Sequence, residues 1–359
     1  MTTPKFSNST LSIHTVLKKR INEYFQQKKI SPSGNSALYI KAGILLSVYI
    51  LIYLSLLLFS LPVWIAIIGC VLLGALTASI GFNVMHDGAH GSFSKHPWLN
   101  KLAASSLDML GASSFMWNIK HNVIHHAYTN IDGVDDDINA QPFLRLCATQ
   151  KRYKIYRYQY IYFWLLYTML YLFWVFFTDY KKYFTSKIGS VPLPKLKLKD
   201  HISFWSFKLM YLFLFIALPI YLCGFIPWMV GFLICAAVAG FLLSIVFQLA
   251  HTVGETSFPV PTQPANKLED EWALHQLKST ANFATKNKFI TWWLGGLNYQ
   301  IEHHLFPKIS HIHYPAICKI VRQTCAESQW PYIEHNKVYL AVKSHISYLK
   351  KLGQVQQQL

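Results

Sequence analysis

The sequence contains few charged residues. Asp, Glu, Lys and Arg together make up 14% of its 359 residues, whereas about 25% is usual in soluble domains. Hydrophobic residues make up 53%, and many of them lie in long uninterrupted runs. This composition argues against an ordinary soluble domain and predicts an integral membrane protein.

Acidic residues are especially scarce. The chain has 16 Asp and Glu against 33 Lys and Arg, which gives a formal net charge of +17. Basic chains usually contact nucleic acid or anionic lipid. Because the sequence has no nucleic-acid-binding motif and is rich in apolar runs, we expect membrane lipid and acidic proteins as partners, and no nucleic acid.

Cysteine motifs and a signal peptide are also lacking. The six cysteines include no C-x-x-C pair, and three of them lie within apolar runs, which argues against a disulfide framework or a thiolate metal site. Residues 1–37 are polar and basic and contain no apolar signal-peptide region. We therefore expect a cytoplasmic N-terminal segment here, with targeting by the first apolar segment.

Five apolar segments approach the roughly 20 residues that a helix needs to cross the hydrocarbon core. Very short turns that contain Pro62 and Gly224 join the first two and the last two segments, which predicts two helical hairpins. The segments lie at about residues 38–60, 62–85, 158–178, 204–225 and 227–250.

Seven of the 16 histidines form three clusters, each beyond the end of an apolar stretch. Neutral imidazole is a common metal ligand, and two histidines four residues apart share one face of a helix, so both rings can reach one ion. Many imidazoles without matching thiolates suit iron better than a Cys-based zinc site. The clusters are His86 and His90; His121, His125 and His126; and His303 and His304.

Two further residues complete a candidate ligand set. His251 ends the last apolar segment, and Gln300 precedes the third cluster by three residues. Gln300 would bind a metal directly or hold a metal-bound water. Together with the seven clustered histidines these residues supply enough ligands for two metal ions. We interpret the pattern as a membrane-bound di-metal centre, most simply two irons, that activates oxygen.

Other residues are candidates for supporting the ligands or for lining a substrate channel. Asp87 would orient a ligand, and the acidic residues 132–137 would accept hydrogen bonds from ligand imidazoles or simply form a solvated loop. Seven other histidines, His311 and His345 among them, are expected at the surface. The named candidates are Asp87, Trp117, Asn118, Asp136 and His275.

The clusters must meet on one side of the membrane, so the chain must cross it an even number of times between His90 and His303. Three apolar segments lie in between, and 158–178 has basic residues on both flanks, which predicts an interfacial segment. A buried, re-entrant or partly inserted helix would satisfy the same condition. We therefore expect an all-α membrane protein with four transmembrane helices in two hairpins, interfacial helices, and a cytoplasmic helical cap that holds the di-metal site. Neither short turn contains Lys or Arg, in agreement with the positive-inside rule.

The three clusters resemble the histidine boxes of the membrane fatty acid desaturases. HDGAH is similar to the first box, HNVIHH to the second and QIEHH to the third. The Gln that opens the third box resembles front-end desaturases, which insert a double bond between an existing one and the carboxyl end. The resemblance covers about residues 38–325, which makes 326–359 a cytoplasmic C-terminal tail. It implies two iron ions and an O2-dependent reaction that leaves a cis double bond in an acyl-CoA or a phospholipid.

One departure from the family pattern concerns electron supply. Many eukaryotic front-end desaturases carry a fused cytochrome b5 domain with an HPGG haem motif, and nothing similar occurs in this sequence. The resemblance therefore implies a separate donor such as ferredoxin or cytochrome b5, and a chain more similar to bacterial linoleoyl-CoA-type members. The membrane would be the inner membrane of a bacterium or the endoplasmic reticulum of a eukaryote, with the site and both termini cytoplasmic.

Three alternatives follow from the same residues. A hydroxylase or sphingolipid-modifying enzyme of the same fold would use the same ligands. A metal transporter would place its ligands near the bilayer midplane, whereas these clusters lie at the ends of the apolar segments. Zinc could replace iron in an overexpressed sample, because the affinity order of divalent metals does not favour iron(II).

Overall fold

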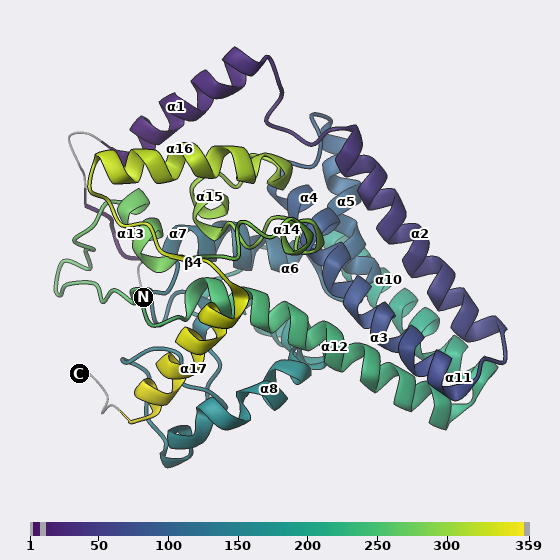
Figure 1. Ribbon diagram of the computed structural model, residues 1–359. Coiled ribbons are helices and arrows are strands. Elements are labelled where there is room, and N and C mark those ends of the chain that lie inside the picture. The colour runs from purple at the N-terminus through teal and green to yellow at the C-terminus, as the bar shows by residue number, and fades with distance from the viewer. Residues whose placement is uncertain (1–2, 8–11, 355–359) are drawn as a thin grey trace.

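Two pairs of long apolar helices extend from one side of the molecule, as the computed structural model shows for residues 3–7 and 12–354 (Figure 1). In the first pair, α3 continues without a break through a π-helical segment, η1, into α4. In the second pair, Gly224 separates the two helices. The two pairs confirm the helical hairpins expected from the short turns. Their bounds are α2 (Ser36–Leu58), α3 (Val63–Ile80), η1 (Gly81–Met85) and α4 (His86–His90), then α10 (Leu198–Leu212), η6 (Phe213–Ala217), α11 (Leu218–Cys223) and α12 (Phe225–His251).

These helices expose many large apolar side chains. Ile40, Leu51 and Leu58 on α2, and Val63 and Trp64 on α3, are each more than half exposed. Soluble monomers rarely expose contiguous apolar patches of this kind, so the surface fits a lipid environment. Five helices in the described part of the chain are long and apolar enough to cross a membrane: Ser36–Leu58, Val63–His90, Lys154–Thr185, Leu198–Cys223 and Phe225–His251.

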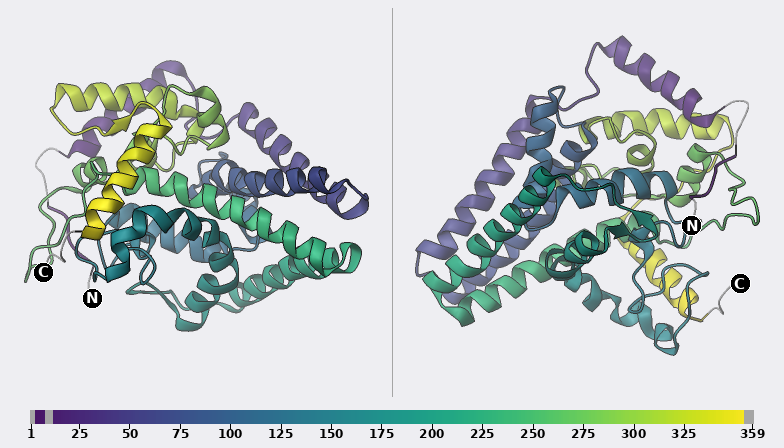
Figure 2. Two further views of the ribbon diagram at one scale, coloured as in Figure 1. Left: turned by 60° about the horizontal axis from the view of Figure 1, so that its bottom comes forward. Right: turned by 180° about the vertical axis from the view of Figure 1, so that it is seen from behind.

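The third of these helices, Lys154–Thr185, is not part of either hairpin. Its central part, α8, lies obliquely across α12 (Figures 1 and 2). A Cβ atom added to Gly240 of α12 would lie 2.6 Å from the carbonyl oxygen of Thr168, so the two backbones touch there. The contact lies in the half of α12 nearer to His251. The parts of this helix are η4 (Lys154–Tyr158), α8 (Gln159–Phe173), η5 (Trp174–Thr178) and α9 (Asp179–Thr185).

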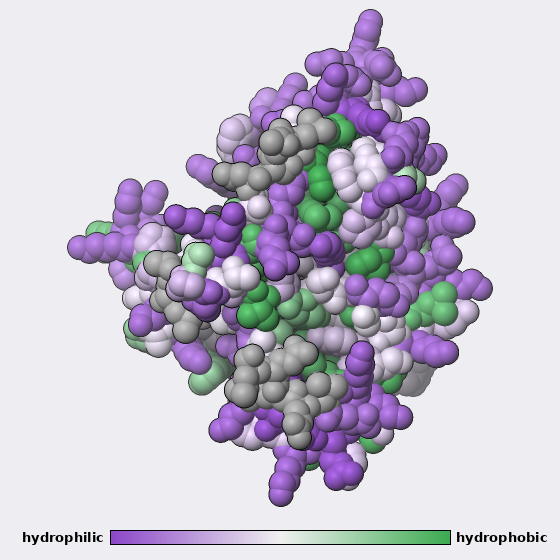
Figure 3. Space-filling view, turned by 90° about the vertical axis from the view of Figure 1, so that its left-hand side faces the viewer, coloured by the Kyte–Doolittle hydropathy of each residue, from purple (hydrophilic) through white to green (hydrophobic). Residues whose placement is uncertain are grey.

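Shorter elements form a cap at the opposite end of the molecule from the hairpin turns (Figures 1 and 2). The face of the cap seen in Figure 3 is largely hydrophilic. The helices are α1 (Ile13–Lys28), α5 (Pro97–Met109), α6 (Ser114–Asn118), η2 (Ile119–His125), α7 (His126–Tyr128), η3 (Asp136–Ile138), α13 (Trp272–Ser279), α14 (Lys288–Trp293), α15 (Gln300–Leu305), η7 (His311–His313), α16 (Tyr314–Glu327) and α17 (Val338–Gln354). Two short pairings are the strands of the described residues: β1 (Lys187–Ile188) antiparallel to β2 (Val191–Pro192), and β3 (Asn282–Phe283) parallel to β4 (Glu334–His335).

The core of the cap holds α15 in place. Ile301 and Leu305 of α15 pack in one hydrophobic cluster with Ile317 and Val321 of α16 and with Leu17 of α1. All five side chains are at most 1% exposed. Because α15 carries the third histidine cluster, this packing fixes those imidazoles against the ends of the long helices.

The segment expected to be a C-terminal tail contains an ordered, packed helix. Ala341, His345 and Leu349 of α17 are buried, and α17 contacts α8 and α12. The expectation that His345 and His311 lie at the surface is wrong, since they are 0% and 4% exposed. In α17 the four-residue spacing puts His345 on the apolar face of the helix, so packing of that face buries it.

Candidate metal centre

The predicted ligands come from four separate stretches of chain. His86 and His90 lie on α4 at the end of the first hairpin, and His251 is the last residue of α12. η2 and α7 carry the second cluster, and α15 carries Gln300, His303 and His304. Both η1, just before His86, and η2 are π-helical, a local geometry that recurs at functional sites.

The eight histidines converge on one buried region. In one group, the ring nitrogens of His86, His90, His121 and His303 lie within 4.8 Å of one another. His125, His251 and His304 form a second group of the same kind. His126 joins the two, because it forms a further group with His303 and His304. The prediction that two histidines four residues apart reach the same ion agrees with the grouping of His86 and His90. His121 and His125 have the same spacing but contribute mainly to different groups.

The two nitrogens of a ring have different surroundings in several of these histidines. The Nδ1 atoms of four imidazoles contact oxygens of the surrounding protein: His125 contacts Asp135 Oδ2 (2.9 Å), His251 the Ser279 carbonyl (3.3 Å), His303 Tyr314 Oη (3.1 Å) and His304 Gln276 Oε1 (2.8 Å). The oxygens of Asp135, Ser279 and Gln276 can only accept, so these three contacts hold the proton on Nδ1 and leave the Nε2 lone pair free.

The free nitrogens lack any other partner. Among the described residues, the Nε2 atoms of His90, His125, His251, His303 and His304 are buried without a hydrogen bond. His121 Nε2 and His126 Nε2 lie 3.2 Å apart, a spacing that two lone pairs tolerate only with a proton or a cation near them. Buried polar atoms are nearly always paired in folded proteins, so this donor set fits a pair of metal ions.

Burial keeps most of these rings neutral. The pKa values of His121, His126, His303 and His304 lie well below the usual 6.5, first because burial disfavours the charged ring and then because neighbouring histidines repel it. His125 is different: burial lowers its pKa, but Asp135 and Asp137 outweigh that effect and raise it. Neutral imidazole is the form that binds metals.

Comparison with known proteins agrees with this geometry. The family model described as "Fatty acid desaturase" matches residues 62–336. The chain belongs to the fatty acid desaturase family. It is 34% identical to the "sn-1 linoleoyl-lipid 6-desaturase" of Arthrospira platensis, over 94% of this chain and 91% of that protein.

Two further relatives show the same pattern. The Synechocystis "sn-1 linoleoyl-lipid 6-desaturase" is 33% identical over 94% of each chain. The "Acyl-lipid (8-3)-desaturase" of Physcomitrium patens is 34% identical over 97% of this chain and 75% of that protein. The family is one of oxidoreductases that act on acyl lipids in membranes, so the prediction of a fatty acid desaturase is confirmed.

The acidic residues around the ligands play different parts in this desaturase. Asp135, rather than Asp136, contacts the imidazole of His125, and Asp137 lies 3.6 Å from the same ring. Asp136 is placed 3.2 Å from Lys182 Nζ. The Asp87 carboxylate accepts hydrogen bonds from Ser310 Oγ (2.7 Å) and the His311 backbone amide (3.3 Å). Asp87, which lies beside His86, therefore connects the first histidine cluster to Ser310 and His311, which follow the third cluster.

The other four candidate residues lie in different surroundings. Trp117 stacks on the His121 imidazole, with ring centroids 4.3 Å apart, whereas Asn118 is exposed and accepts a hydrogen bond from Asn122. Gln300 is buried, and its amide donates to the Leu297 carbonyl (2.8 Å). His275 is buried against Phe6 and lies outside the histidine groups of the described residues.

Sequence reasoning missed several residues that contact the imidazoles of the candidate ligands, Gln276 and Tyr314 among them. Gln276 binds His304 and also donates its amide to the His126 carbonyl (3.1 Å). Tyr314 binds His303 from the start of α16. Gln276 adjoins the candidate His275, but its spacing in the chain carries no metal-ligand signal. Neither residue could have been found from a motif, because the packing of α13 and α16 against α15 creates these contacts.

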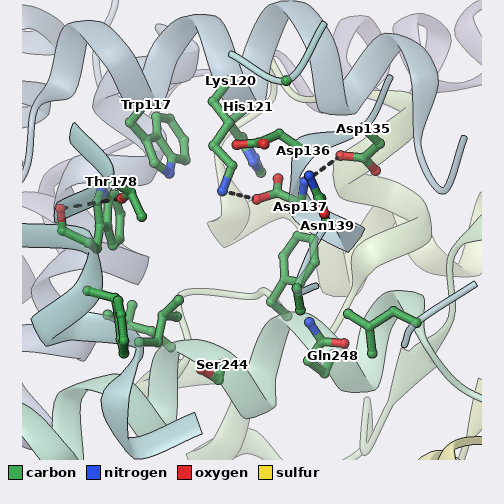
Figure 4. A pocket seen from close by; sticks show the side chains of 18 of the residues that line it. Trp117, Lys120, His121, Asp135, Asp136, Asp137, Asn139, Thr178, Ser244 and Gln248 are labelled. Atoms are coloured by element: carbon green, nitrogen blue, oxygen red, sulfur yellow. Dashed lines mark hydrogen bonds and ion pairs between the residues drawn. The ribbon is translucent and has the colours of Figure 1, made fainter. Parts of the chain in front are cut away.

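A cavity of about 790 Å³ lies beside the histidines of the desaturase (Figure 4). His86, His121, Gln300 and His303 line it on one side. Apolar side chains of α8 and η5 also line it, including Leu166, Leu170, Phe173 and Phe177. Toward the surface the lining includes the exposed Lys181 and Lys187. The arrangement can hold an apolar chain alongside a cluster of imidazoles, with a polar end toward the surface.

Proposed function

We propose that this protein is an O2-dependent, di-iron desaturase of acyl lipids, of the front-end type. The observation that carries the proposal is the pair of buried imidazole groups along the side of an apolar cavity. The printed names of the relatives, which are acyl-lipid and linoleoyl-lipid desaturases, support an acyl chain as the substrate. The Gln300 position in the third histidine box supports the front-end assignment.

The two groups of imidazoles would hold two iron ions. His86, His90, His121 and His303 suit one ion, and His125, His251 and His304 suit the other, with His126 between them. Bound iron would supply the oxidising power that no side-chain acid or base has toward an unactivated methylene. In an overexpressed sample zinc would compete for the same nitrogens, because iron(II) is the weaker binder.

The protein's own task is to orient the acyl chain and exclude water. Apolar side chains of α8 and η5 would hold the chain straight past His86 and His303, which lie on the cavity wall. Fixing the reacting carbons there lowers the entropic cost of reaction. The Asp135 carboxylate and the Gln276 amide would hold His125 and His304 in the metal-binding tautomer.

Four crossings of the membrane agree with this site. The end of α4 and the end of α12 meet at the histidines, while the turns at Pro62 and Gly224 lie together at the far end, where the Cys223 thiol donates to the Leu56 carbonyl. α8 would remain near the interface because its contacts with α12, at Gly240 and Ser244, lie toward the histidine end. The histidine side, with its excess of Lys and Arg, would be cytoplasmic.

Electrons would come from a separate protein such as ferredoxin or cytochrome b5. The net charge of +17 favours the approach of an acidic carrier. A hydroxylase of the same fold remains the second candidate, since the imidazole groups would serve both reactions. Metal transport is not favoured, because the ligands lie at the ends of α4 and α12 and in the cap.

Expression in a desaturase-deficient host that is fed defined fatty acids tests the proposal. Gas chromatography–mass spectrometry of total acyl chains should reveal a product lighter by two hydrogen atoms, and locating its double bond would give the regiochemistry. His125→Ala should abolish that product. A product heavier by one oxygen atom would identify a hydroxylase, and no product despite bound iron and a supplied donor would refute acyl-lipid desaturation.

A further inference from the structure

A buried histidine outside the metal centre joins the C-terminal helix to the cavity wall. His345 of α17 lies beyond residues 62–336, which the family model matches, and is 0% exposed. Its ring packs against Phe163 of α8, with ring centroids 5.3 Å apart. The metal centre does not use this imidazole, so its burial and its contacts need another explanation.

The contacts of His345 determine where its proton lies. Nδ1 is 2.7 Å from the backbone carbonyl of Thr252, and a carbonyl can only accept a hydrogen bond. Nδ1 therefore carries the proton. Burial lowers the pKa of the ring to about 4, which makes it neutral at physiological pH. Nε2 must then accept, and the Tyr167 hydroxyl, 2.7 Å away, donates to it.

The hydrogen bonds of His345 continue to the cavity on both sides. Tyr167 of α8 lines the cavity directly. On the other side, the Thr252 hydroxyl donates to Gln248 Oε1 (2.7 Å), and Gln248 of α12 lines the same cavity. Ser244 of α12 donates to the Tyr167 carbonyl (3.2 Å). A single buried network thus connects α17, α8 and α12 at the wall.

This part of the wall lies close to the metal centre. Gln248 precedes His251 by less than one helical turn. Phe247, also a cavity residue, contacts the ring of His251 with centroids 4.7 Å apart. Figure 4 shows Ser244 and Gln248 across the cavity from Trp117 and His121. Because Tyr167 is joined to this wall through Ser244, a shift of Tyr167 would change the cavity in which an acyl chain would lie.

We propose that His345 is a positioning residue that holds Tyr167 in the cavity wall and thereby determines which carbons of the bound acyl chain face the imidazole groups. The inference rests on the proposed desaturase function and names a specificity determinant within it. Removing the imidazole would leave a buried hydroxyl without an acceptor, which is costly. The Tyr167 side chain would then turn toward the cavity or admit water.

The test compares product ratios among four variants in the desaturase-deficient host, fed two unsaturated acids of different chain length. His345→Phe keeps the ring packing on Phe163 but removes the acceptor. We expect the ratio of products from the two chain lengths, or the ratio of double-bond positions, to shift about threefold or more. His345→Gln, whose amide oxygen can replace Nε2 as acceptor, should keep the ratio near that of the unsubstituted protein.

The matched control is the removal of the orphaned hydroxyl. Adding His345→Phe to Tyr167→Phe should shift the ratio no further than Tyr167→Phe alone does, because the hydroxyl that His345 holds is then already absent. Iron content, measured by inductively coupled plasma mass spectrometry, should stay unchanged in all four. A product ratio is independent of the amount of folded enzyme, so mere destabilisation would not move it.

The two failures are distinguishable. Absence of product from the unsubstituted protein would refute the proposed function. Normal turnover in the unsubstituted protein with an unchanged ratio in His345→Phe would overturn the role of His345. Loss of iron or of all product in His345→Phe that the double variant does not reverse would also overturn it, since that result indicates a general structural role.

Discussion

At the scale of single residues, the site depends on which nitrogen of each imidazole is engaged. Asp135, Ser279, Tyr314 and Gln276 each take up the Nδ1 side of a different ligand ring. Such partners fix the ring orientation, those that can only accept also fix the tautomer, and a carboxylate raises the basicity of the imidazole. Asp135 is the charged member of this set and is 2% exposed.

Asp135→Asn should weaken metal binding. The amide can still contact His125, but it lacks the charge that strengthens the ligand, so we expect a loss of about 10- to 100-fold in metal affinity or activity. Iron content after dialysis against graded chelator measures the affinity. Asp136→Asn is the control, because Asp136 contacts Lys182 rather than a ligand. Equal iron retention by the two variants would contradict the assignment of Asp135.

At the scale of elements, the contact between α8 and α12 shapes the cavity. Gly240 permits it, since a Cβ atom there would approach the Thr168 carbonyl to 2.6 Å. α8 also supplies the apolar lining, including Leu166 and Leu170. The distance between these two helices therefore sets the width of the space in which an acyl chain would lie.

Gly240→Ala should push the two helices apart. Overpacking of this kind typically costs about 1–3 kcal/mol, and the melting temperature in detergent should fall. Gly43→Ala is a matched control in α2, because nothing lies within 4 Å of a Cβ atom there. A Gly240→Ala protein as stable as Gly43→Ala would show that the α8–α12 contact is not tight.

The path of α8 through the membrane is testable by cysteine labelling. If α8 stays at the interface, Lys151→Cys and Lys187→Cys, both exposed and on either side of it, should react with an impermeant maleimide from the same side of the membrane. Ser60→Cys in the first hairpin turn should react from the opposite side. The unsubstituted chain gives the background from native cysteines. Labelling of residues 151 and 187 from opposite sides would establish a fifth crossing.

At the scale of the whole molecule, four separate stretches of chain bring the histidines together. Their mutual packing places eight buried imidazoles side by side, and among the described residues several Nε2 atoms have no protein partner. The cost of burying those nitrogens is offset when a cation binds them. We therefore expect the metal to stabilise the assembly of the cap on the long helices.

Removing the metal should lower the melting temperature of the whole protein. A ligand present at 100 times its dissociation constant stabilises the folded state by about 2.7 kcal/mol. Chelation should therefore shift thermal unfolding downward, and iron(II) should restore it. His304→Ala, which lacks one ligand of the second group, should respond less to the chelator. A chelator response equal to that of the unsubstituted protein would argue that the groups do not hold the metal.

Local signals in the sequence were enough to predict the long helices and the gathering of the histidines. Apolar runs of the required length predicted five long helices, and all five are present. The three histidine clusters predicted a metal centre because their spacing and residue type carry chemical information that survives without coordinates. His251, predicted from its place at the end of an apolar segment, lies in one of the histidine groups, whereas the role of Gln300 stays a prediction.

The tertiary structure alone decided the partners of those ligands. The assignment of His125 to Asp135 rather than Asp136, and the contacts of Gln276 and Tyr314, depend on how α13, α16 and the acidic loop pack. The burial of His345 depends on the docking of α17 against α8 and α12. The sequence by itself determined the residue types and the helices, because a helix depends on neighbours along the chain. Contacts between distant segments depend on tertiary packing, which the local sequence pattern does not encode.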